Sequence, residues 1–508
     1  MPLQMAPNRT IFYRLATGAA GRSIAMLVVV SYLCFLLSVG SGGEGAWARK
    51  DVGAGTTAVY TETETETVTR VVTRTVERMA PQATVTRVVT KEVVVPRARR
   101  KLLKGPPTAA FKDNLLPEVQ YLTSWTGSGF TNDVMTFINL IYLGVLTERV
   151  PIVPHFIPTH VMKSVAHTGP GIDFGDVFDL ERYYELTGQA VLDWRQVKDP
   201  ESKTVDPLGC WNVWEPVNPK VNQGPHWTPS PHRLKLDVSY SNAPGWIKRS
   251  PNSEDDLHTQ FTALMALGFP TMRNRFLTAA ELSPILQERH SPDEHLLCFD
   301  NLYWACDLEG HEMEQDWSAA WRLVGQHLHW TKKIEGLANE YLRDAFKLGP
   351  KDPVPYFIAI HARRGDFGAN PHACNNLPRD ECLAPLSAYD RRVKQMQAKL
   401  KADKGLDVTH VLLTSDELDP EWWATALRTY DWARADHALL ETRKKHGVWY
   451  PILIDAALQS HPRAMGVVGT FSSTVSVVAG KRVVSWNGGV PHVLVRWGRW
   501  GPDAEYEQ

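Results

Sequence analysis

The chain has 508 residues, of which 43% are hydrophobic and 22% are charged, a globular composition that is ample for more than one packed core. Its formal net charge is −1, so no overall field attracts nucleic acid, we expect no nucleic-acid partner, and any basic cluster has to be judged locally. The 18 tryptophans mainly indicate core packing, with room for a ring or two that stacks on a sugar.

The N-terminal stretch predicts a membrane anchor. Residues 1–22 contain arginines and no acid, and an uncharged, largely apolar segment follows over residues 23–43. At 1.5 Å per residue the apolar part of this segment is just long enough to cross a thin bilayer. The positive-inside rule leaves residues 1–22 in the cytosol and the bulk of the chain in a lumen. The competing interpretation is a signal peptide that is cleaved near residues 46–48.

Residues 44–114 predict a disordered stem. They are dominated by Thr, Val, Glu and Arg, and T-V-T-R-V-V-T-R at Thr67 recurs as T-V-T-R-V-V-T-K at Thr84. The threonines offer sites for O-glycans, which would hold the stem extended. A coiled coil is the alternative, but valine and threonine at these spacings make poor heptads.

Five of the six cysteines lie beyond the apolar N-terminal segment. Cys298 with Cys306, and Cys374 with Cys382, are close enough in sequence for local disulfides in an oxidising compartment, which leaves Cys210 unpaired. We predict the Cys374–Cys382 bridge in the lumenal protein. Neither pair has C-x-x-C spacing or a matching pair of histidines, so a structural zinc site is not expected.

The globular part begins near Leu115 with a β-α-β pattern. A strand over 121–125 is followed by a G-S-G-F-T-N-D loop, an apolar helical run and a P-I-V-P strand. Gly127 and Gly129 let backbone amides approach a ligand at the N-terminus of the helix, which Asn132 is also placed to reach. Ordinary turn chemistry is the alternative. The third glycine of a dinucleotide fingerprint is missing.

The next section of the chain carries a weaker pattern. Residues 170–345 hold Pro- and Trp-rich connections and then a long helical pattern from about Asp316 to Phe346. We place a domain junction in the stretch from Pro350 to Pro355. The chain therefore divides into an N-terminal, acceptor-side lobe over 115–350 and a C-terminal, nucleotide-sugar-binding lobe over 351–508.

A short strand over residues 356–360 is followed at once by His361, Arg363, Arg364 and Asp366. A guanidinium is always charged and presents a planar fork of donors, so two neighbouring arginines at the end of a strand suit a diphosphate. The alternative is an Arg–Asp ion pair that braces a loop.

The remaining chain alternates between helices and strands. Helical patterns cover 388–401 and 422–430, a strand ends at Asp416, and G-T-F-S-S-T joins a strand to the start of a helix. This alternation implies a parallel sheet, whose carboxyl ends meet along one crevice. The residues collected there are His361, Arg363, Asp416, Asp455 and Ser472 to Thr474.

These residue types indicate a nucleotide diphosphate. Hydroxyls and amides at the start of a helix bind phosphate oxygens. Asp455 either accepts the paired N–H groups of a guanine edge or caps a helix. The chain has no D-x-D triplet, so we expect no metal, and arginine has to stabilise the leaving diphosphate.

Taken together, H-A-R-R-G-D, the G-F-T-N-D loop with its helix and P-I-V-P strand, and the late L-I-D and G-T-F-S-S-T-V resemble the GDP-fucose fucosyltransferases, the superfamily of the protein O-fucosyltransferases and α-1,6-fucosyltransferases. The resemblance runs from about Leu115 to Arg499 in three ordered blocks. It implies an α/β fold of two facing Rossmann-like lobes (GT-B-like). It also implies a metal-independent, inverting transfer of fucose from GDP-fucose, with no cofactor, to a protein hydroxyl or a glycan.

The resemblance also implies roles for individual residues. Arg363 matches the arginine that holds the diphosphate and stabilises its departure, and Asn132 matches an asparagine near the reacting centre. The other matching or neighbouring residues are His361, Asp455, Ser472, Ser473, Thr474, Gly129 and Phe130 for donor binding, and Arg364, Asp366 and Asp416 in support, with Arg364 as a candidate brace for Asp366.

One position departs from the family. Some relatives that modify protein hydroxyls have a glutamate base just before G-F, where this chain has Ser128, while the nearby Asp133 is expected on the helix. The alternatives to a fucosyltransferase are therefore a transferase for another GDP-sugar and a catalytically silent lumenal protein that binds a GDP-sugar or glycan. For the enzyme we expect a single-pass type II protein of the Golgi or endoplasmic reticulum membrane.

Overall fold

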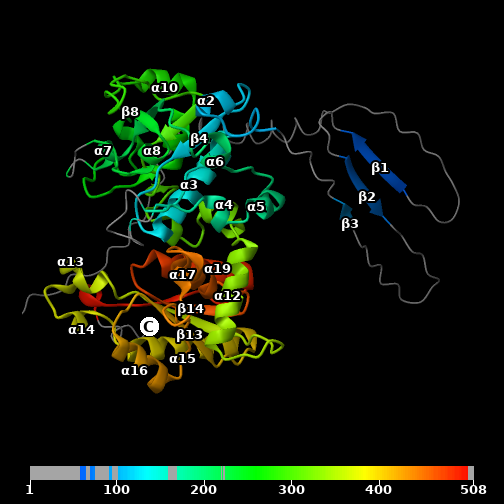
Figure 1. Cartoon of the computed structure of the whole chain (residues 1–508), viewed down its shortest axis with the longest axis vertical. Coiled ribbons are helices and arrows are strands. Elements are labelled where there is room, and N and C mark those ends of the chain that lie inside the picture. Colours follow the sequence, from blue (N-terminus) through cyan, green and yellow to red (C-terminus); the bar gives the residue numbers. More distant parts are fainter. Residues whose placement is uncertain are drawn as a thin grey trace, which may run out of the picture. The chain divides into compact units, whose positions relative to one another are not determined.

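A computed structural model describes residues 101–157, 159, 169–218, 220 and 224–501, and the backbone of 58–63, 69–74 and 91–93. The chain divides into two compact units, residues 1–100 and residues 101–508. The predicted cytosolic tail and membrane anchor lie outside the described residues. Figure 1 shows the elements of both units.

The first unit contains a three-stranded antiparallel sheet in the order β1-β2-β3. Its strands are β1 (Ala58–Thr63), β2 (Thr69–Arg74) and β3 (Lys91–Val93). These strands lie within residues 44–114, where the sequence predicts a disordered stem; much of that range lies outside the described residues, so the stem stays a prediction. The valine and threonine residues of β1 and β2 are β-branched and favour an extended backbone.

The second unit holds a six-stranded parallel sheet in the order β6-β5-β4-β10-β7-β8. Its strands are β4 (Tyr121–Ser124), β5 (Val150–Val153), β6 (Leu192–Asp193), β7 (Asp206–Asn212), β8 (Leu236–Asn242) and β10 (Leu296–Phe299). A further parallel pair is formed by β9 (Thr259–Gln260) and β11 (Ala305–Cys306). The predicted β-α-β opening is confirmed, because helix α3 (Phe130–Thr147) connects the neighbouring parallel strands β4 and β5.

A second parallel sheet has four strands in the order β13-β12-β14-β15. Its strands are β12 (Phe357–Ala362), β13 (His410–Ser415), β14 (Ala464–Thr470) and β15 (Val493–Val495). Every residue of β12 and β14 is buried, as expected when helices cover both faces of a parallel sheet. The prediction of a parallel sheet in this part of the chain is confirmed, and the fold is mixed α/β.

The helices before β12 lie around the six-stranded sheet, except that α12 packs against α18 in the half that holds the four-stranded sheet (Figure 1). Those before β12 are α2 (Phe111–Asn114), α3, α4 (Phe174–Val177), α5 (Leu180–Thr187), α6 (Trp194–Val197), α7 (Trp214–Val217), α8 (Ser230–Arg233), η2 (Gly245–Ile247), α9 (Phe261–Leu267), α10 (Pro270–Phe276), η3 (Glu312–Glu314), α11 (Ala319–Leu323), η4 (Gly325–His327) and α12 (Lys332–Ala345). Those after it are η5 (Phe367–Ala369), α13 (Pro371–Cys374), α14 (Arg379–Cys382), α15 (Leu386–Lys404), α16 (Pro420–Tyr430), α17 (Thr442–His446), α18 (Tyr450–Gln459), α19 (Thr474–Asn487) and η6 (Gly498–Trp500).

Helix α3 is the central helix of the six-stranded sheet. It is long and apolar enough to pass a length-and-composition test for a membrane span, but most of it is buried inside the protein. It packs against β4 and β5 and also contacts α19 from the other half of the unit. The largest buried core accordingly runs from Leu122 and Phe137 through Trp330 to Leu453 and Val483, so it joins the two halves.

Two predictions are wrong, one about where the stem ends and one about the continuity of a helix. Residues 101–114 do not belong to the stem: Phe111 and Leu115 are buried in a core cluster with Trp194, and Asn114 donates hydrogen bonds to the carbonyls of residues 196 and 197. The single helix expected over 316–346 is broken into α11, η4 and α12. Gly325 is the first residue of η4, and an added Cβ there would lie 2.4 Å from the Trp321 ring, so the chain turns at a residue without a side chain.

The disulfide prediction is half right. Cys374 and Cys382 are bonded, as predicted. Cys298 is bonded to Cys210 and not to Cys306, which is free and buried. Cys210 lies on β7 and Cys298 on β10, and these strands are neighbours only in the folded sheet. Strand order, which a sequence does not display, therefore decides this pairing.

Candidate functional site

A cavity of about 1050 Å³ lies at the carboxyl edge of the four-stranded sheet and is closed on one side by the first turn of α3. After β12 the chain adds β13 on one side of it and later adds β14 on the other side, and ligands of open α/β sheets bind at such a switch point. The cavity is lined by most of the residues that the sequence singled out: Gly129, Phe130, Asn132, His361, Arg363, Asp366, Asp416, Asp455, Ser472, Ser473 and Thr474.

Arg363 follows β12 directly and lies at the centre of this edge. Its backbone N–H donates to Thr470 Oγ1 at 2.9 Å, which ties the end of β12 to the end of β14. Its guanidinium pairs with Asp416 and with Asp366 at 2.7 Å. The side chain remains 28% exposed, so the guanidinium is held in place by two carboxylates and is still open to the cavity.

Arg364 points away from the cavity. It is buried, its Nε donates to Glu417 at 2.6 Å, and its guanidinium lies 5.1 Å from the Trp422 ring centroid. The prediction that Arg364 braces Asp366 is wrong, because Asp366 pairs with Arg363 instead. Successive side chains of an extended segment point to opposite sides, so two adjacent arginines cannot both face one ligand here.

Asp416 organises the turn after β12. One carboxylate oxygen accepts hydrogen bonds from the backbone N–H groups of Arg364 at 2.7 Å and Gly365 at 3.0 Å, and the other accepts from Arg363. Gly365 is required there, because an added Cβ would lie 2.5 Å from Asp416 Oδ2. Asp416 therefore acts on the arginine and its loop, and its predicted supporting role in donor binding stays a prediction.

The turn after β14 brings the N-terminus of α19 to the same cavity. Ser472 has a φ of 67°, a conformation that reverses the chain sharply. Ser473 is the N-cap residue and its side chain makes no capping hydrogen bond. The first N–H groups of a helix have no partner within it, so serine hydroxyls and helix amides together form a potential anion site beside Arg363.

His361 is neutral in the folded protein. Burial lowers its pKa to about 4, so it does not add charge to the cluster at neutral pH. Its Nδ1 lies 2.9 Å from Ser476 Oγ, and that oxygen also accepts from the backbone N–H of Thr470. His361 is therefore fixed between the ends of β12 and α19, with its ring on the cavity wall.

Asp455 reaches the cavity by a different route from the one predicted. It lies inside α18, not at the end of a strand, and it does not cap a helix. Its Oδ1 lies 2.9 Å from His437 Nε2, and this carboxylate raises the pKa of His437 against the opposing effect of burial. The second oxygen of Asp455 has no hydrogen bond within the described part of the chain.

The first turn of α3 faces the second sheet across the cavity. Gly129 is its N-cap, and Asn132 Oδ1 accepts a hydrogen bond from Thr474 Oγ1 at 2.7 Å. This contact leaves the amide N–H groups of Asn132 as donors. Asp133 is buried, accepts from the backbone N–H groups of Gly127 and Ser128, and does not line the cavity. Burial raises its pKa well above the usual range.

The structure adds cavity residues that the sequence analysis missed, among them Tyr303, Thr414, Trp423, Arg434, His437 and Gln459. Gln459 had a signal in the sequence. It lies four residues after Asp455 in an otherwise apolar run, and residues at this spacing share one face of a helix. His437 and Arg434 come from an irregular segment between helices, where no periodicity marks them.

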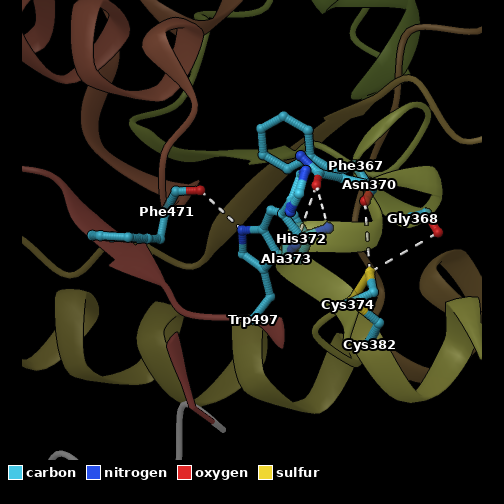
Figure 2. The surroundings of a disulfide bond; sticks show 9 residues. All are labelled: Phe367, Gly368, Asn370, His372, Ala373, Cys374, Cys382, Phe471 and Trp497. Atoms are coloured by element: carbon cyan, nitrogen blue, oxygen red, sulfur yellow. Dashed lines mark hydrogen bonds between the residues drawn. A yellow bond between two sulfur atoms is a disulfide. The ribbon is translucent and has the colours of Figure 1, made fainter. Parts of the chain in front are cut away.

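The Cys374–Cys382 disulfide braces one wall of the cavity (Figure 2). Cys374 lies under η5, with its sulfur 3.7 Å from the carbonyl oxygen of Phe367. The Phe367 ring lines the cavity and stacks on Trp497 with centroids 4.8 Å apart. Trp497 in turn donates to the Phe471 carbonyl at 3.0 Å. The bridge thus supports the loops that follow both β12 and β14.

No group of three or more His, Cys, Asp or Glu side chains that could hold a metal ion occurs in the part of the chain that the structure describes. Three of the acids that line the cavity each pair with a basic side chain. Asp366 and Asp416 pair with Arg363, and Asp455 pairs with His437.

No family model and no curated protein matches the chain. Among solved structures, it is similar to POFUT1 in complex with GDP-fucose, with 16% identity over 75% of this chain and 98% of that chain and a TM-score of 0.45. It is also similar to the fucosyltransferase NodZ from Bradyrhizobium, with 14% identity over 71% of this chain and 93% of that chain and a TM-score of 0.37. At TM-scores below 0.5 such likeness does not decide function, which has to rest on this chain's own residues.

Proposed function

We propose that the chain is a glycosyltransferase that moves fucose from GDP-fucose to a protein hydroxyl or a glycan, without a metal or cofactor and with inversion at the sugar carbon. One observation carries the proposal. Arg363 and the N-terminus of α19 meet at the β12–β14 switch point and open to one cavity of about 1050 Å³. The α/β scaffold with two parallel sheets is compatible with the GT-B-like, two-lobed architecture and the lobes 115–350 and 351–508 that the sequence predicts.

The diphosphate fits the charges of this edge. A guanidinium fork and helix amides bind phosphate oxygens by charge-assisted hydrogen bonds, and Ser472 and Ser473 add hydroxyl donors. In transfer, the bond between the sugar carbon and the β-phosphate oxygen breaks, and its electron pair leaves with GDP. Arg363 lies where this negative charge develops, and preorganised positive charge at such a point lowers the barrier.

The acceptor attacks the sugar carbon from the face opposite the leaving diphosphate, with an oxocarbenium-like transition state. Its hydroxyl oxygen forms the new bond, and its proton passes to a base. Ser128 is not a base at neutral pH, and Asp133 is buried, does not line the cavity, and accepts from the loop amides through Oδ1. We therefore assign Asn132 a positioning role near the reacting centre and leave the proton to solvent or to a group on the acceptor.

A lumenal location follows from the same proposal. The bridges Cys210–Cys298 and Cys374–Cys382 suit an oxidising compartment. For the membrane contact we propose the topology that the sequence predicts, a type II protein of the Golgi or endoplasmic reticulum membrane with its catalytic part in the lumen and one N-terminal helix in the membrane.

The proposal is tested by turnover. The purified full-length protein is incubated in chelator with GDP-fucose or UDP-galactose and with an array of glycans and hydroxyl-bearing folded domains, and nucleotide release and labelled product are followed. We expect GDP release that an acceptor accelerates, with no UDP release. Absence of both transfer and GDP-fucose hydrolysis, with intact GDP binding, would instead favour the silent binding protein, for which the occupied Asp133 is the supporting observation. Turnover with a different GDP-sugar would replace fucose as the donor sugar.

A further inference from the structure

Gln459 carries a buried amide oxygen without a partner. Its side chain is 1% exposed, it lines the cavity, and its Oε1 has no hydrogen bond. Of the nine buried side-chain atoms of this kind in the described part of the chain, it is the only one whose residue lines this cavity. An unpaired buried carbonyl is costly, and a ligand that donates to it would remove that cost.

The orientation of the amide is fixed by its neighbour on β13. Gln459 Nε2 donates to Thr414 Oγ1 at 2.8 Å. Thr414 uses its single hydroxyl hydrogen on the carbonyl oxygen of Ile360 at 2.8 Å, so it can only accept from Gln459. A flipped amide would bring two acceptors together. The nitrogen therefore faces Thr414, and the oxygen faces away from it.

Asp455 lies one helical turn before Gln459 on α18, and residues four apart share a helix face. His437 occupies one carboxylate oxygen of Asp455 at 2.9 Å, which leaves the other oxygen to accept. His437 is itself held by Thr442, whose Oγ1 lies 3.0 Å from Nδ1. Asp455 and Gln459 thus lie on one helix face, both line the cavity, and each is held by a hydrogen bond, to His437 and to Thr414.

Two neighbouring acceptors select one kind of base edge. Guanine presents two adjacent donors, the ring N1–H and the exocyclic 2-amino group. Adenine presents an acceptor beside a donor, and uracil presents one N–H flanked by two carbonyl oxygens, so each would face at least one acceptor with another acceptor. A site built to accept a donor rejects a ligand that lacks it, because the buried acceptor is then left unpaired.

We propose that Gln459 reads the 2-amino group of the guanine base through Oε1, while Asp455 accepts from N1–H, and that Thr414 holds the Gln459 amide in the required orientation. The inference rests on the proposed function, since it assumes a guanine nucleotide in this cavity. It assigns the base specificity to an amide that is distinct from the carboxylate predicted from the sequence.

The test compares GDP with inosine diphosphate, which lacks only the 2-amino group. Both are titrated calorimetrically into the full-length protein and into Gln459→Met. We expect wild type to bind GDP about tenfold tighter than inosine diphosphate, and the variant to lose most of this ratio through weaker GDP binding alone. Gln397→Met is the matched control: Gln397 also donates through Nε2, to Val408 at 3.0 Å, but does not line the cavity.

The ratio of two affinities does not depend on the fraction of folded protein, so partial misfolding does not hide the effect. If Gln459→Met does not fold at all, Thr414→Val keeps the glutamine but removes its anchor, and we expect the GDP preference to fall about two- to threefold. An unchanged ratio in the folded variants overturns the inference while GDP binding itself stands. Failure of wild type to bind either nucleotide overturns the inference together with the proposed function.

Discussion

At the carboxyl edge of the six-stranded sheet, Asp300 accepts hydrogen bonds from the backbone N–H groups of Val213 at 2.7 Å and His226 at 2.8 Å. Asp133 holds its own glycine loop in the same way. Both carboxylates are fully buried. At the carboxyl edge of the four-stranded sheet, by contrast, the side chain of Ser473 makes no capping hydrogen bond, the first N–H groups of α19 have no partner within the helix, and Ser472 and Ser473 line a cavity.

The difference shows how a shared topology is used in two ways. At the first edge, Asp133 and Asp300 accept hydrogen bonds from the chain's own backbone, and burial raises the pKa values of both. At the second edge, the donors and the guanidinium of Arg363 are left for a ligand. Substitutions at the first edge should therefore change stability, and substitutions at the second should change binding and transfer.

The largest effect is expected at Arg363. Arg363→Ala should reduce fucosyl transfer by about a thousandfold or more, because the charge that offsets the leaving diphosphate is lost. Its thermal unfolding midpoint should stay within a few degrees of wild type, since the side chain is partly exposed. Initial rates of GDP release measure this, with Arg428→Ala, whose side chain is 75% exposed on α16, as the control. Transfer by Arg363→Ala at the wild-type rate would contradict the assignment.

The Cys210–Cys298 bridge is expected to contribute to stability and not to GDP binding. It closes a loop with a sequence separation of 88, so replacing both cysteines by alanine should lower the free energy of unfolding by about 4 kcal/mol. Denaturant titration measures the loss. The GDP affinity of the remaining folded protein should be unchanged, because the bridge lies within the six-stranded sheet. A large loss of affinity would contradict the separate roles assigned to the carboxyl edges of the two sheets.

The Cys374–Cys382 bridge should affect both properties. Its sequence separation is 8, which predicts a loss of about 2–3 kcal/mol for the double alanine variant. Because the bridge supports the loop that carries Phe367, we also expect GDP binding to weaken severalfold. Calorimetry on this variant and on the Cys210–Cys298 variant distinguishes the two bridges; equal GDP affinities would show that the loop does not need its brace.

The contribution of Asp300 to the free energy of unfolding should depend on pH. Burial raises its pKa to about 7 in the folded protein, above an ordinary value of about 3.9. Between these values the folded state keeps a proton that the unfolded state has released, so this group's contribution to stability falls as the pH rises. The free energy of unfolding of wild type minus that of Asp300→Asn should therefore decrease by about 2 kcal/mol from pH 5 to pH 7.5. Denaturant titrations at each pH test this, and a constant difference would refute it.

The smallest effect is expected at Asp366. It competes with a ligand for the Arg363 guanidinium, but its side chain is 41% exposed, and exposed ion pairs are weak. Asp366→Asn should therefore tighten GDP binding by only about two- to threefold. Asp380→Asn is a matched control, because it removes the same charge near Arg364 instead of Arg363. Weaker GDP binding by Asp366→Asn would mean that this carboxylate positions the arginine.

The parts of the site that a sequence can reveal are those with local signals. Arg363 follows a buried strand at once, and Ser472 to Thr474 join a strand to a helix, so both could be placed at a sheet edge before the structure was known. Asn132 was located by the glycines before its helix. In each case the backbone pattern within about ten residues fixes the position of the side chain.

The parts that were missed depend on contacts between distant segments. The partner of Cys298 follows from the order of β10 and β7, which are separated along the chain by β8, β9 and the helices α7 to α10. His437 reaches Asp455 from a segment without periodicity. The different directions of Arg363 and Arg364 follow from the positions of Asp416 and Glu417 after β13. None of these contacts leaves a local pattern in the chain.

The most direct test of the account is whether the cavity at the β12–β14 edge binds a guanine nucleotide diphosphate through Arg363. Calorimetric titration of the full-length protein with GDP and UDP in chelator, repeated on Arg363→Ala, addresses this. We predict GDP binding that is at least about tenfold tighter than UDP binding, and a loss of about tenfold or more in the variant. Absence of GDP binding by folded wild type, or equal GDP affinity in the variant, would contradict the account.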